Sequence, residues 1–187
     1  MSRAAKRRKR LGWTIAGALV VIVALNTFVV RQGRVRLRSM EPVLNEGDWV
    51  LFEKPGLKRA GARRFDIVVF KAPNDPDSIY IKRVIGLPGE IVEARQGALY
   101  VDGRAVQMPC GVDWGGVEFA PATVRAAHYF VVGDNPSESR DSRDWGGVPR
   151  DYILGRVLWR FWPPGAMKIY RRCDAAHEGA GNADKGI

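Results

Sequence analysis

Residues 65–71 read FDIVVFK, and residues 79–85 read IYIKRVI. Both runs are short, and β-branched and aromatic side chains dominate them. Turn-forming residues close each run, at positions 72–77 and 86–89. Runs of this length and composition between Gly, Pro and Asn are typical of β-strands, because helices need a longer periodic stretch. These residues therefore predict two consecutive strands.

Further runs of the same kind predict more strands. They cover residues 49–52, 90–94, 98–101, 129–132 and 153–162. Residues 103–125 are rich in Gly and Pro and are expected to form a long loop. The fold class that follows is mainly β, with a coiled or barrel-like antiparallel sheet in the globular domain and one N-terminal transmembrane helix.

The transmembrane helix is predicted from residues 11–30, which carry no charge. Twenty such residues span about 30 Å as a helix, the thickness of a bilayer core. A cleaved signal peptide is the alternative, but the run is long for one and no small-x-small site follows it. The predicted segments are a basic cytoplasmic N-terminus at 1–10, the anchor at 11–30, a juxtamembrane segment at 31–38, a β-rich domain at 39–172 and a disordered tail at 173–187.

The net charge of +10 comes entirely from the N-terminal region. Residues 1–38 hold ten Lys or Arg and no acidic residue, which leaves twenty of each sign in residues 39–187. Six of the ten cations precede the anchor and four follow it, so the positive-inside rule favours a cytoplasmic N-terminus. The domain would then lie outside the cytoplasm. We expect membrane lipid to be a partner of the cations and expect no nucleic-acid partner.

Cysteine and histidine are scarce. Cys110 and Cys173 would either pair outside the cytoplasm or remain free thiols, and both readings stay open. The two histidines, His128 and His177, have no metal-ligand spacing with the cysteines, so neither a metal nor another cofactor is predicted.

Lys82 is the first candidate catalytic residue. On a strand it shares one face with Tyr80 and Val84, and apolar surroundings would lower its pKa. A free lysine has a pKa near 10.4 and is neutral in only about one molecule in 2,500 at pH 7. A buried Lys82 is therefore a candidate general base, whereas a strand lysine that reaches solvent would have no such role.

Ser39 is the candidate nucleophile. It lies in the segment RSMEP at 38–42, separated from the apolar run by eight residues. Pro42 restricts the backbone and favours an extended Glu41, so the segment would hold the hydroxyl rigidly and direct backbone N–H groups at an oxyanion. The short motif also fits an ordinary turn.

Residues 133–149 combine turn formers with charged side chains after a predicted strand. Ser139, Asp141 and Arg143 are spaced by two and would face one way if this segment were extended. Asp141 and Arg143 would then form an ion pair that braces a site, and Ser139 would hydrogen-bond a base. A solvated loop with a weak surface ion pair is the alternative.

Four blocks bring these candidates together. They read SMEPVL at 39–44, DIVVF at 66–70, YIKRVIGLPG at 80–89 and GDNPSESRDSRDWG at 133–146. In this order they resemble the bacterial type I signal peptidases (leader peptidases), a family of Ser–Lys peptidases. The resemblance extends over about residues 10–165, and its third and fourth blocks are long and specific.

The resemblance implies a membrane-anchored serine endopeptidase that removes signal peptides from exported preproteins. Ser39 would attack the peptide carbonyl and Lys82 would act as general base. Ser139 would orient the lysine, and Asp141 and Arg143 would form the supporting ion pair. The implied substrate-binding residues, which select Ala-x-Ala by lining shallow pockets, are Met40, Leu44, Tyr80 and Ile81. Many members carry a hydroxyl residue two positions before the nucleophile to assist the oxyanion hole, whereas this chain has Leu37.

Other functions remain open. A specialised maturation peptidase, of the conjugation or organellar inner-membrane type, would use the same Ser39 and Lys82. A self-cleaving repressor-type protein is disfavoured because no DNA-binding domain precedes the β region. A Ser-His-Asp hydrolase using His128 is disfavoured because the chain has no nucleophile elbow. A non-enzymatic, membrane-anchored binding module would predict that Ser39 and Lys82 are dispensable.

Overall fold

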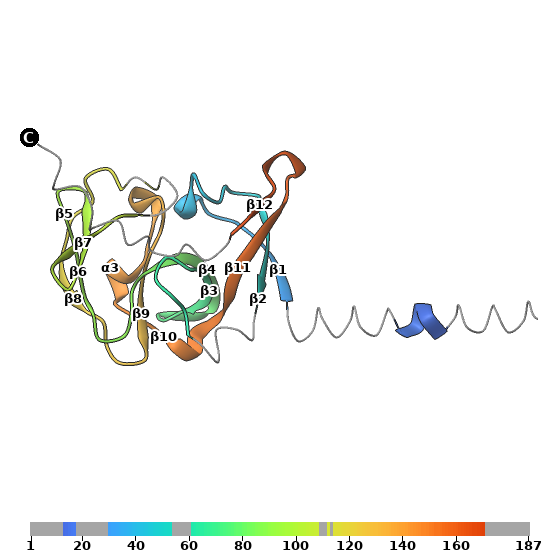
Figure 1. Cartoon of the computed structure of the whole chain (residues 1–187), viewed down its shortest axis with the longest axis horizontal. Coiled ribbons are helices and arrows are strands. Elements are labelled where there is room, and N and C mark those ends of the chain that lie inside the picture. The colour runs from blue at the N-terminus through green and yellow to red at the C-terminus, as the bar shows by residue number, and fades with distance from the viewer. Residues whose placement is uncertain (1–12, 18–29, 54–60, 109–111, 113, 171–187) are drawn as a thin grey trace, which may run out of the picture.

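The computed structural model describes residues 13–17, 30–53, 61–108, 112 and 114–170. These residues form two antiparallel β-sheets (Figure 1). The mainly β prediction is confirmed. The barrel-like form is not, because the strand order of the larger sheet is open and ends at different strands on its two sides in the part of the chain that the structure describes.

The larger sheet has the order β1-β2-β11-β3-β4-β9-β10, with β12 paired to β11. Its strands are β1 (Val30–Arg34), β2 (Trp49–Glu53), β3 (Ile67–Ala72), β4 (Asp75–Gly86), β9 (His128–Val132), β10 (Val148–Pro149), β11 (Ile153–Trp162) and β12 (Lys168–Ile169). The predicted pair around residue 75 is confirmed as the β3–β4 hairpin, in which Val68 lies opposite Lys82. β4 is longer than predicted because it begins directly after the turn at Pro73 and Asn74.

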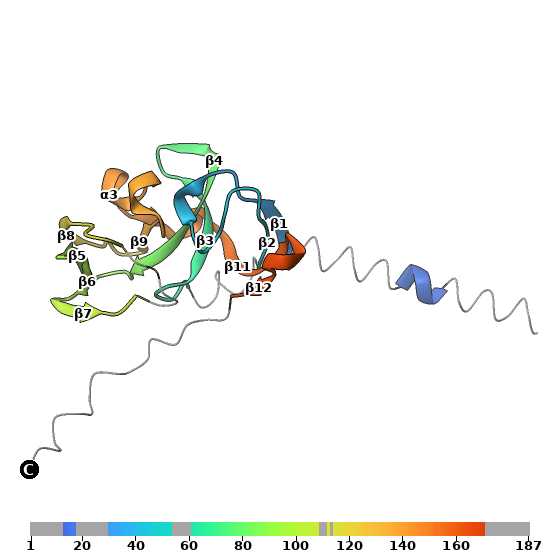
Figure 2. The ribbon, with the colours of Figure 1, turned by 90° about the horizontal axis from the view of Figure 1, so that it is seen from above.

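The smaller sheet has the order β7-β6-β5-β8 and lies at the opposite end of the domain from β1 and β2, as two perpendicular views agree (Figures 1 and 2). Its strands are β5 (Ile91–Arg95), β6 (Ala98–Val101), β7 (Arg104–Val106) and β8 (Phe119–Thr123). The strands predicted at 90–94 and 98–101 are confirmed, and they pair as the β5–β6 hairpin. The loop predicted at residues 103–125 is wrong in part, because β7 and β8 lie within it.

The helical elements of the described domain are all short. They are η1 (Arg38–Met40), η3 (Pro136–Glu138), α3 (Ser142–Trp145), η4 (Arg150–Tyr152) and η5 (Pro164–Ala166). The extended conformation expected for residues 139–143 is therefore not observed, because α3 begins at Ser142. Asp141 is the N-cap of α3, and its side chain and that of Asp144 form a capping box.

The core occupies both faces of the larger sheet, and β3 explains why. Ile67 and Val69 belong to the larger apolar cluster on one face, whereas Val68 and Phe70 belong to a second cluster on the other. A strand covered on both faces is apolar at every position rather than at alternate ones. β3 and its neighbour β4 are thus the most rigidly held part of the sheet, and β4 carries Lys82.

The boundary between the predicted anchor and the predicted juxtamembrane segment differs from the structure. Val30–Arg34 pairs with β2 as an edge strand, so the sheet begins at the last residue of the expected anchor and includes half of the expected juxtamembrane segment. Residues 13–17 are helical, while 1–12, 18–29 and the expected tail at 173–187 lie outside the described residues. No helix within the described ranges is long and apolar enough to cross a membrane.

Candidate active site

Lys82 is buried on the face of β4 predicted from its spacing. Only 3% of the residue is exposed, and its ammonium nitrogen lies 5.9 Å from the centroid of the Tyr80 ring. The pKa of Lys82 is lowered from 10.5 to about 8, chiefly because burial disfavours the charged form; Asp141 and Asp134 raise the pKa and Arg143 lowers it, and their smaller effects are included in this value. The site therefore favours a lysine that gives up its proton readily.

Ser39 lies directly against this lysine. Lys82 Nζ is hydrogen-bonded to Ser39 Oγ at 2.5 Å, although the two residues are 43 positions apart in the chain. Ser39 is 5% exposed and lies in the middle of η1. The N–H groups of the first turn of a helix have no acceptor within that helix, so the Ser39 N–H is available to a negatively charged oxygen.

Residues 133–135 hold η1 in place from the other side. The Asn135 N–H donates to the Ser39 carbonyl at 3.1 Å, and the Asn135 side-chain amide donates to the Arg38 carbonyl at 3.3 Å. Gly133 makes this approach possible, because a Cβ atom there would fall too close to the Ser39 carbonyl oxygen and the Ser139 hydroxyl. The segment that carries Ser39 is thus fixed by the chain that follows β9.

Asp141 connects this segment to the predicted supporting residues. It is fully buried and accepts hydrogen bonds from Ser139 Oγ at 2.6 Å, from the Gly133 N–H at 3.1 Å and from Arg143 Nε at 2.8 Å. The structure therefore brings Ser139, Asp141 and Arg143 together. The Ser139 hydroxyl is bonded to Asp141, and among the described residues it makes no hydrogen bond to Lys82.

Comparison with known proteins now decides the family. A family model described as "Signal peptidase, peptidase S26" matches residues 8–162 of this chain. The chain belongs to this family. As a member of the signal peptidase family it is a hydrolase, and specifically a serine endopeptidase.

Individual relatives agree with the family assignment. A protein named "Probable signal peptidase I-2" from Synechocystis sp. is 38% identical over 159 residues, which cover 82% of this chain and 72% of that protein. "Signal peptidase IB" from Staphylococcus aureus is 32% identical over 177 residues, covering 84% of this chain and 92% of that protein. A crystal structure of a signal peptidase I from Enterococcus faecalis is 32% identical and covers 51% of this chain and 95% of that chain, with a TM-score of 0.44.

The expected substrate-binding residues of this signal peptidase family member fall into two groups. Tyr80 and Ile81 are partly exposed on β4 next to Lys82. Met40 and Leu44 are fully buried members of the larger apolar cluster. Met40 and Leu44 therefore offer no accessible side-chain surface in this structure and instead support η1 from the core.

A second ion pair was missed by the sequence analysis. Arg83 follows Lys82 on β4 and points to the opposite face, where it binds both oxygens of Asp134 at 2.6 Å. Arg83 also donates to the Phe65 carbonyl at 2.9 Å, and both partners of the pair are buried. Both residues lie in the sequence blocks that carry the family resemblance, which could have marked them as candidates. No local sequence pattern indicates that Arg83 and Asp134 pair with each other.

The remaining candidates lie elsewhere. His128 is partly exposed at the start of β9, where its Nδ1 contacts the Ala126 carbonyl oxygen at 2.8 Å, and no described contact joins it to Ser39. The hydrolase alternative based on His128 therefore has no geometric support. Cys110, Cys173 and His177 lie outside the described residues, so a disulfide and two free thiols both stay open.

Proposed function

We propose that this protein removes signal peptides from exported preproteins, with Ser39 as nucleophile and Lys82 as general base. One observation carries the proposal: a buried lysine with a pKa of about 8 is hydrogen-bonded at 2.5 Å to the hydroxyl of a rigidly held serine. At pH 7 such a lysine is neutral in roughly one molecule in ten, against about one in 3,000 for a lysine of pKa 10.5. Burial thus increases the concentration of active base about 300-fold.

The chemistry follows from this pair. Neutral Lys82 takes the proton of Ser39 Oγ as that oxygen attacks the carbonyl carbon of the scissile bond. The Ser39 N–H stabilises the resulting oxyanion, and Lys82 then gives its proton to the leaving amine. A water molecule, deprotonated by Lys82, hydrolyses the acyl-enzyme and restores the serine.

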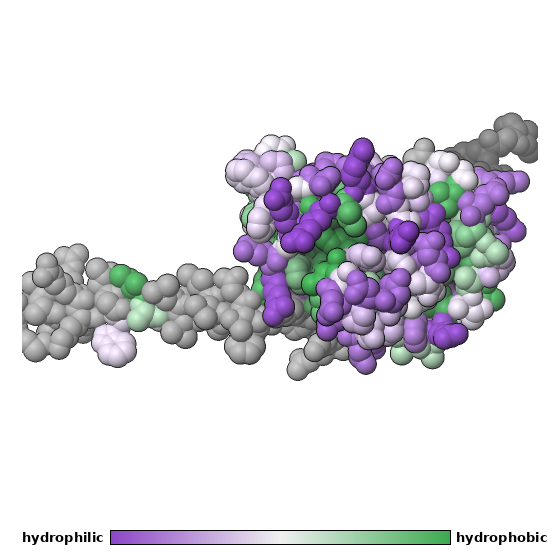
Figure 3. All heavy atoms as spheres, turned by 180° about the vertical axis from the view of Figure 1, so that it is seen from behind, coloured by the Kyte–Doolittle hydropathy of each residue, from purple (hydrophilic) through white to green (hydrophobic). Residues whose placement is uncertain are grey.

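The free edge of β4 supports strand-like binding of the substrate. Residues 75–83 of β4 pair with β3, but β9 pairs with β4 only at Arg83 and beyond. The edge from residue 75 to 82 is therefore unpaired among the described strands, and a peptide would add to it through backbone hydrogen bonds. Ile79, which is 60% exposed, lies on this edge, and one face of the domain has a hydrophobic hollow bordered by hydrophilic residues (Figure 3). Such a surface suits the small apolar residues of an Ala-x-Ala site.

Ser139, Asp141 and Arg143 would act as positioning residues. Arg143 donates to the carbonyl oxygens of Pro136 and Ser139 as well as to Asp141, so it ties η3 to the start of α3. Through Gly133 and Asn135 this network reaches the backbone of Ser39. Its role would be to hold the nucleophile within hydrogen-bonding distance of the lysine.

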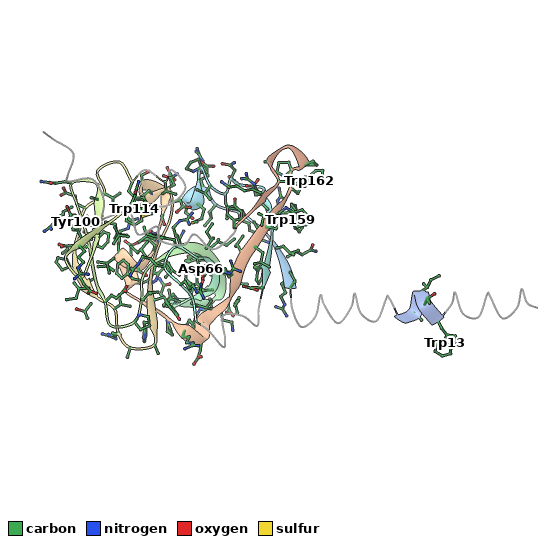
Figure 4. All side chains as sticks on the ribbon, in the orientation of Figure 1. Trp13, Asp66, Tyr100, Trp114, Trp159 and Trp162 are labelled. Carbon is green, nitrogen blue, oxygen red and sulfur yellow. The ribbon has the colours of Figure 1, made fainter. Side chains whose placement is uncertain are left out.

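A location at the membrane would place the enzyme beside membrane-held precursors. The exposed side chains of Trp159 and Trp162 lie at the end of the domain where β1 begins (Figure 4), and Met167 and Ile169 are exposed on the adjoining η5–β12 segment. Indole rings favour the headgroup region of a bilayer. Together with an anchor at 11–30 and a cytoplasmic N-terminus, this end would rest on the outer surface of the plasma membrane.

The test is cleavage of a precursor with an Ala-x-Ala site by the detergent-solubilised full chain. We expect Ser39→Ala and Lys82→Ala to abolish cleavage and His128→Ala to leave it unchanged. Thermal unfolding of each variant controls for loss of fold. A folded wild type that cleaves no precursor, or a Lys82→Ala variant with the wild-type rate, would contradict the proposal.

A further inference from the structure

A cavity lies next to the nucleophile and is not used by the mechanism above. Its volume is about 410 Å³, enough for one large side chain or two small ones. Glu41 and Pro42, which follow the nucleophile segment, form one wall, and Asn135 and Pro136 form a second. Trp114 and Val117, from the connection between β7 and β8, form the third. Neither Lys82 nor the free edge of β4 contributes to it.

The sheet topology determines which part of a substrate would reach this cavity. A peptide paired with the free edge of β4 would lie in line with β9, because both would pair with the same edge of β4. The peptide must turn away from this edge near Lys82, because from Arg83 onward the edge of β4 is already paired with β9, and Gly133 follows β9. Two residues beside the nucleophile line the cavity: Glu41 follows Ser39 by two positions, and the Asn135 N–H donates to the Ser39 carbonyl. If the residues before the scissile bond lie along β4, as the proposed function requires, the residues after the bond are directed into the cavity.

The lining indicates the chemistry of the side chain that would bind. Trp114, Pro42, Val117 and Pro136 offer apolar surface for an aliphatic stem. Arg38 Nε donates to both oxygens of Glu41, at 3.2 and 3.1 Å, but the Arg38 side chain is 63% exposed and the carboxylate is partly exposed, so each oxygen keeps a lone pair for a further donor. Asp134 also lines the cavity, but Arg83 engages both of its oxygens. Glu41 therefore provides the negative charge with room for a further partner.

Trp114 gives an independent indication that the cavity binds a further group, because the hydrogen bonding of its side chain is incomplete. Its indole Nε1 is buried and has no hydrogen-bond acceptor among the described residues (Figure 4 labels the side chain). Buried polar groups are normally satisfied, so this unsatisfied donor is consistent with a site completed by a bound acceptor, such as a backbone carbonyl oxygen of the substrate, while the side-chain head group is left to Glu41.

We propose that this cavity is a specificity site for the first residues of the mature protein, and that it favours a long side chain with a cationic or hydrogen-bond-donating head group over an acidic one. This inference rests on the proposed function. An aliphatic stem would pack on Trp114 and Val117 while the head group reaches Glu41. Because the ion pair would be partly exposed, we expect a preference of roughly three- to five-fold.

The experiment uses one precursor in which the signal peptide is constant and each of the first three mature residues in turn is Lys, Gln or Glu. We expect kcat/KM of the detergent-solubilised full chain to be three- to five-fold higher for Lys than for Glu at one of these positions. Glu41→Gln should remove the difference. The matched control Glu46→Gln changes the same charge on an exposed residue of the same segment outside the cavity lining, and it should keep the difference.

A second variant tests the cavity by volume. Val117→Trp should lower kcat/KM for intact precursors at least five-fold, yet leave unchanged the cleavage of the same signal peptide ending in an N-methylamide, which places nothing in the cavity. A wild type that cleaves every precursor at the same rate, with no effect of Glu41→Gln or Val117→Trp on intact precursors, would overturn this proposal alone. Failure to cleave any precursor or the N-methylamide would overturn the proposed function with it.

Discussion

Replacing Lys82 by Met should stabilise the fold while it abolishes activity. The pKa of Lys82 is about 8 in the folded protein and 10.5 when the side chain is solvated. Each pKa unit corresponds to about 1.4 kcal/mol, so holding this side chain in the fold at pH 7 costs about 3 kcal/mol. Met has similar size and no charge, but it loses the hydrogen bond to Ser39, worth about 1 kcal/mol. The expected net gain in the free energy of unfolding is about 2 kcal/mol at pH 7.

The pH dependence of this gain is the stronger test. The unfolded chain binds a proton at Lys82 up to pH 10.5, whereas the folded chain releases it near pH 8. The wild type therefore becomes more stable as the pH rises through this window, by up to about 1.4 kcal/mol per pH unit. Lys82→Met has no such group. Its advantage should be constant below pH 8, disappear near about pH 9.5, and reverse by up to about 1 kcal/mol, the lost hydrogen bond to Ser39, as the pH approaches 10.5.

The assay is urea unfolding of the full chain in detergent at several pH values from 7 to 10. Lys71→Met is the matched control, because Lys71 is an exposed lysine on the neighbouring strand β3. Its effect on stability should not change across the same pH range. The reasoning is refuted if Lys82→Met is less stable than the wild type at pH 7, or if its stability difference from the wild type is the same at every pH.

Three further predictions concern activity. The rate kcat/KM should rise with pH up to about 8 and then level off, because the neutral form of Lys82 is the proposed base; a pH profile that is flat from 6 to 9 would contradict this assignment. Asp141→Asn should move this rise to lower pH, because Asp141 raises the pKa of Lys82, and should also lower kcat by loosening Ser139; the pH profile separates the two effects. Gly133→Ala should lower kcat at least 100-fold with the fold retained, because its methyl group would displace the Ser39 carbonyl, and circular dichroism checks the fold.

The strands that the sequence predicts best are those that are buried. β-branched and aromatic residues dominate β3, and burial on both faces selects such residues directly. β1 and β8 were missed because both are edge strands. β1 has the sequence VRQGR and β8 has FAPAT, and an edge strand tolerates Gly, Pro and charge because one of its sides has no partner.

The sequence predicted which residues form the supporting network, but it did not predict the backbone conformation of their segment. Ser139, Asp141 and Arg143 do come together, although the segment is not extended. A local signal for the observed shape exists in the sequence. Asp141 is followed three residues later by Asp144, which matches the spacing of a capping box, and this spacing favours a helix start over a strand.

The contact between Ser39 and Lys82 has no local signal. The residues are 43 positions apart, and only the folding of η1 against β4 and the 133–135 segment joins them. Strand periodicity predicted which face of β4 carries Lys82, but it could not predict what covers that face. The resemblance to a family supplied the partner, because a family motif records a tertiary contact that a single sequence does not reveal.

The pair Lys82-Arg83 shows how the fold gives two adjacent cations opposite properties. Neighbouring residues on a strand point to opposite faces, so the two side chains enter different surroundings. Arg83 meets a buried carboxylate and binds it through two hydrogen bonds, which keeps its charge fully compensated. Lys82 meets a hydroxyl instead, and the nearest carboxylates only partly offset its burial. A shift of one residue in the register of β4 would exchange these environments and place a guanidinium, which does not lose its proton, against Ser39. The activity therefore depends on β4 being held in register by its pairing with β3 on one side and with β9 on the other.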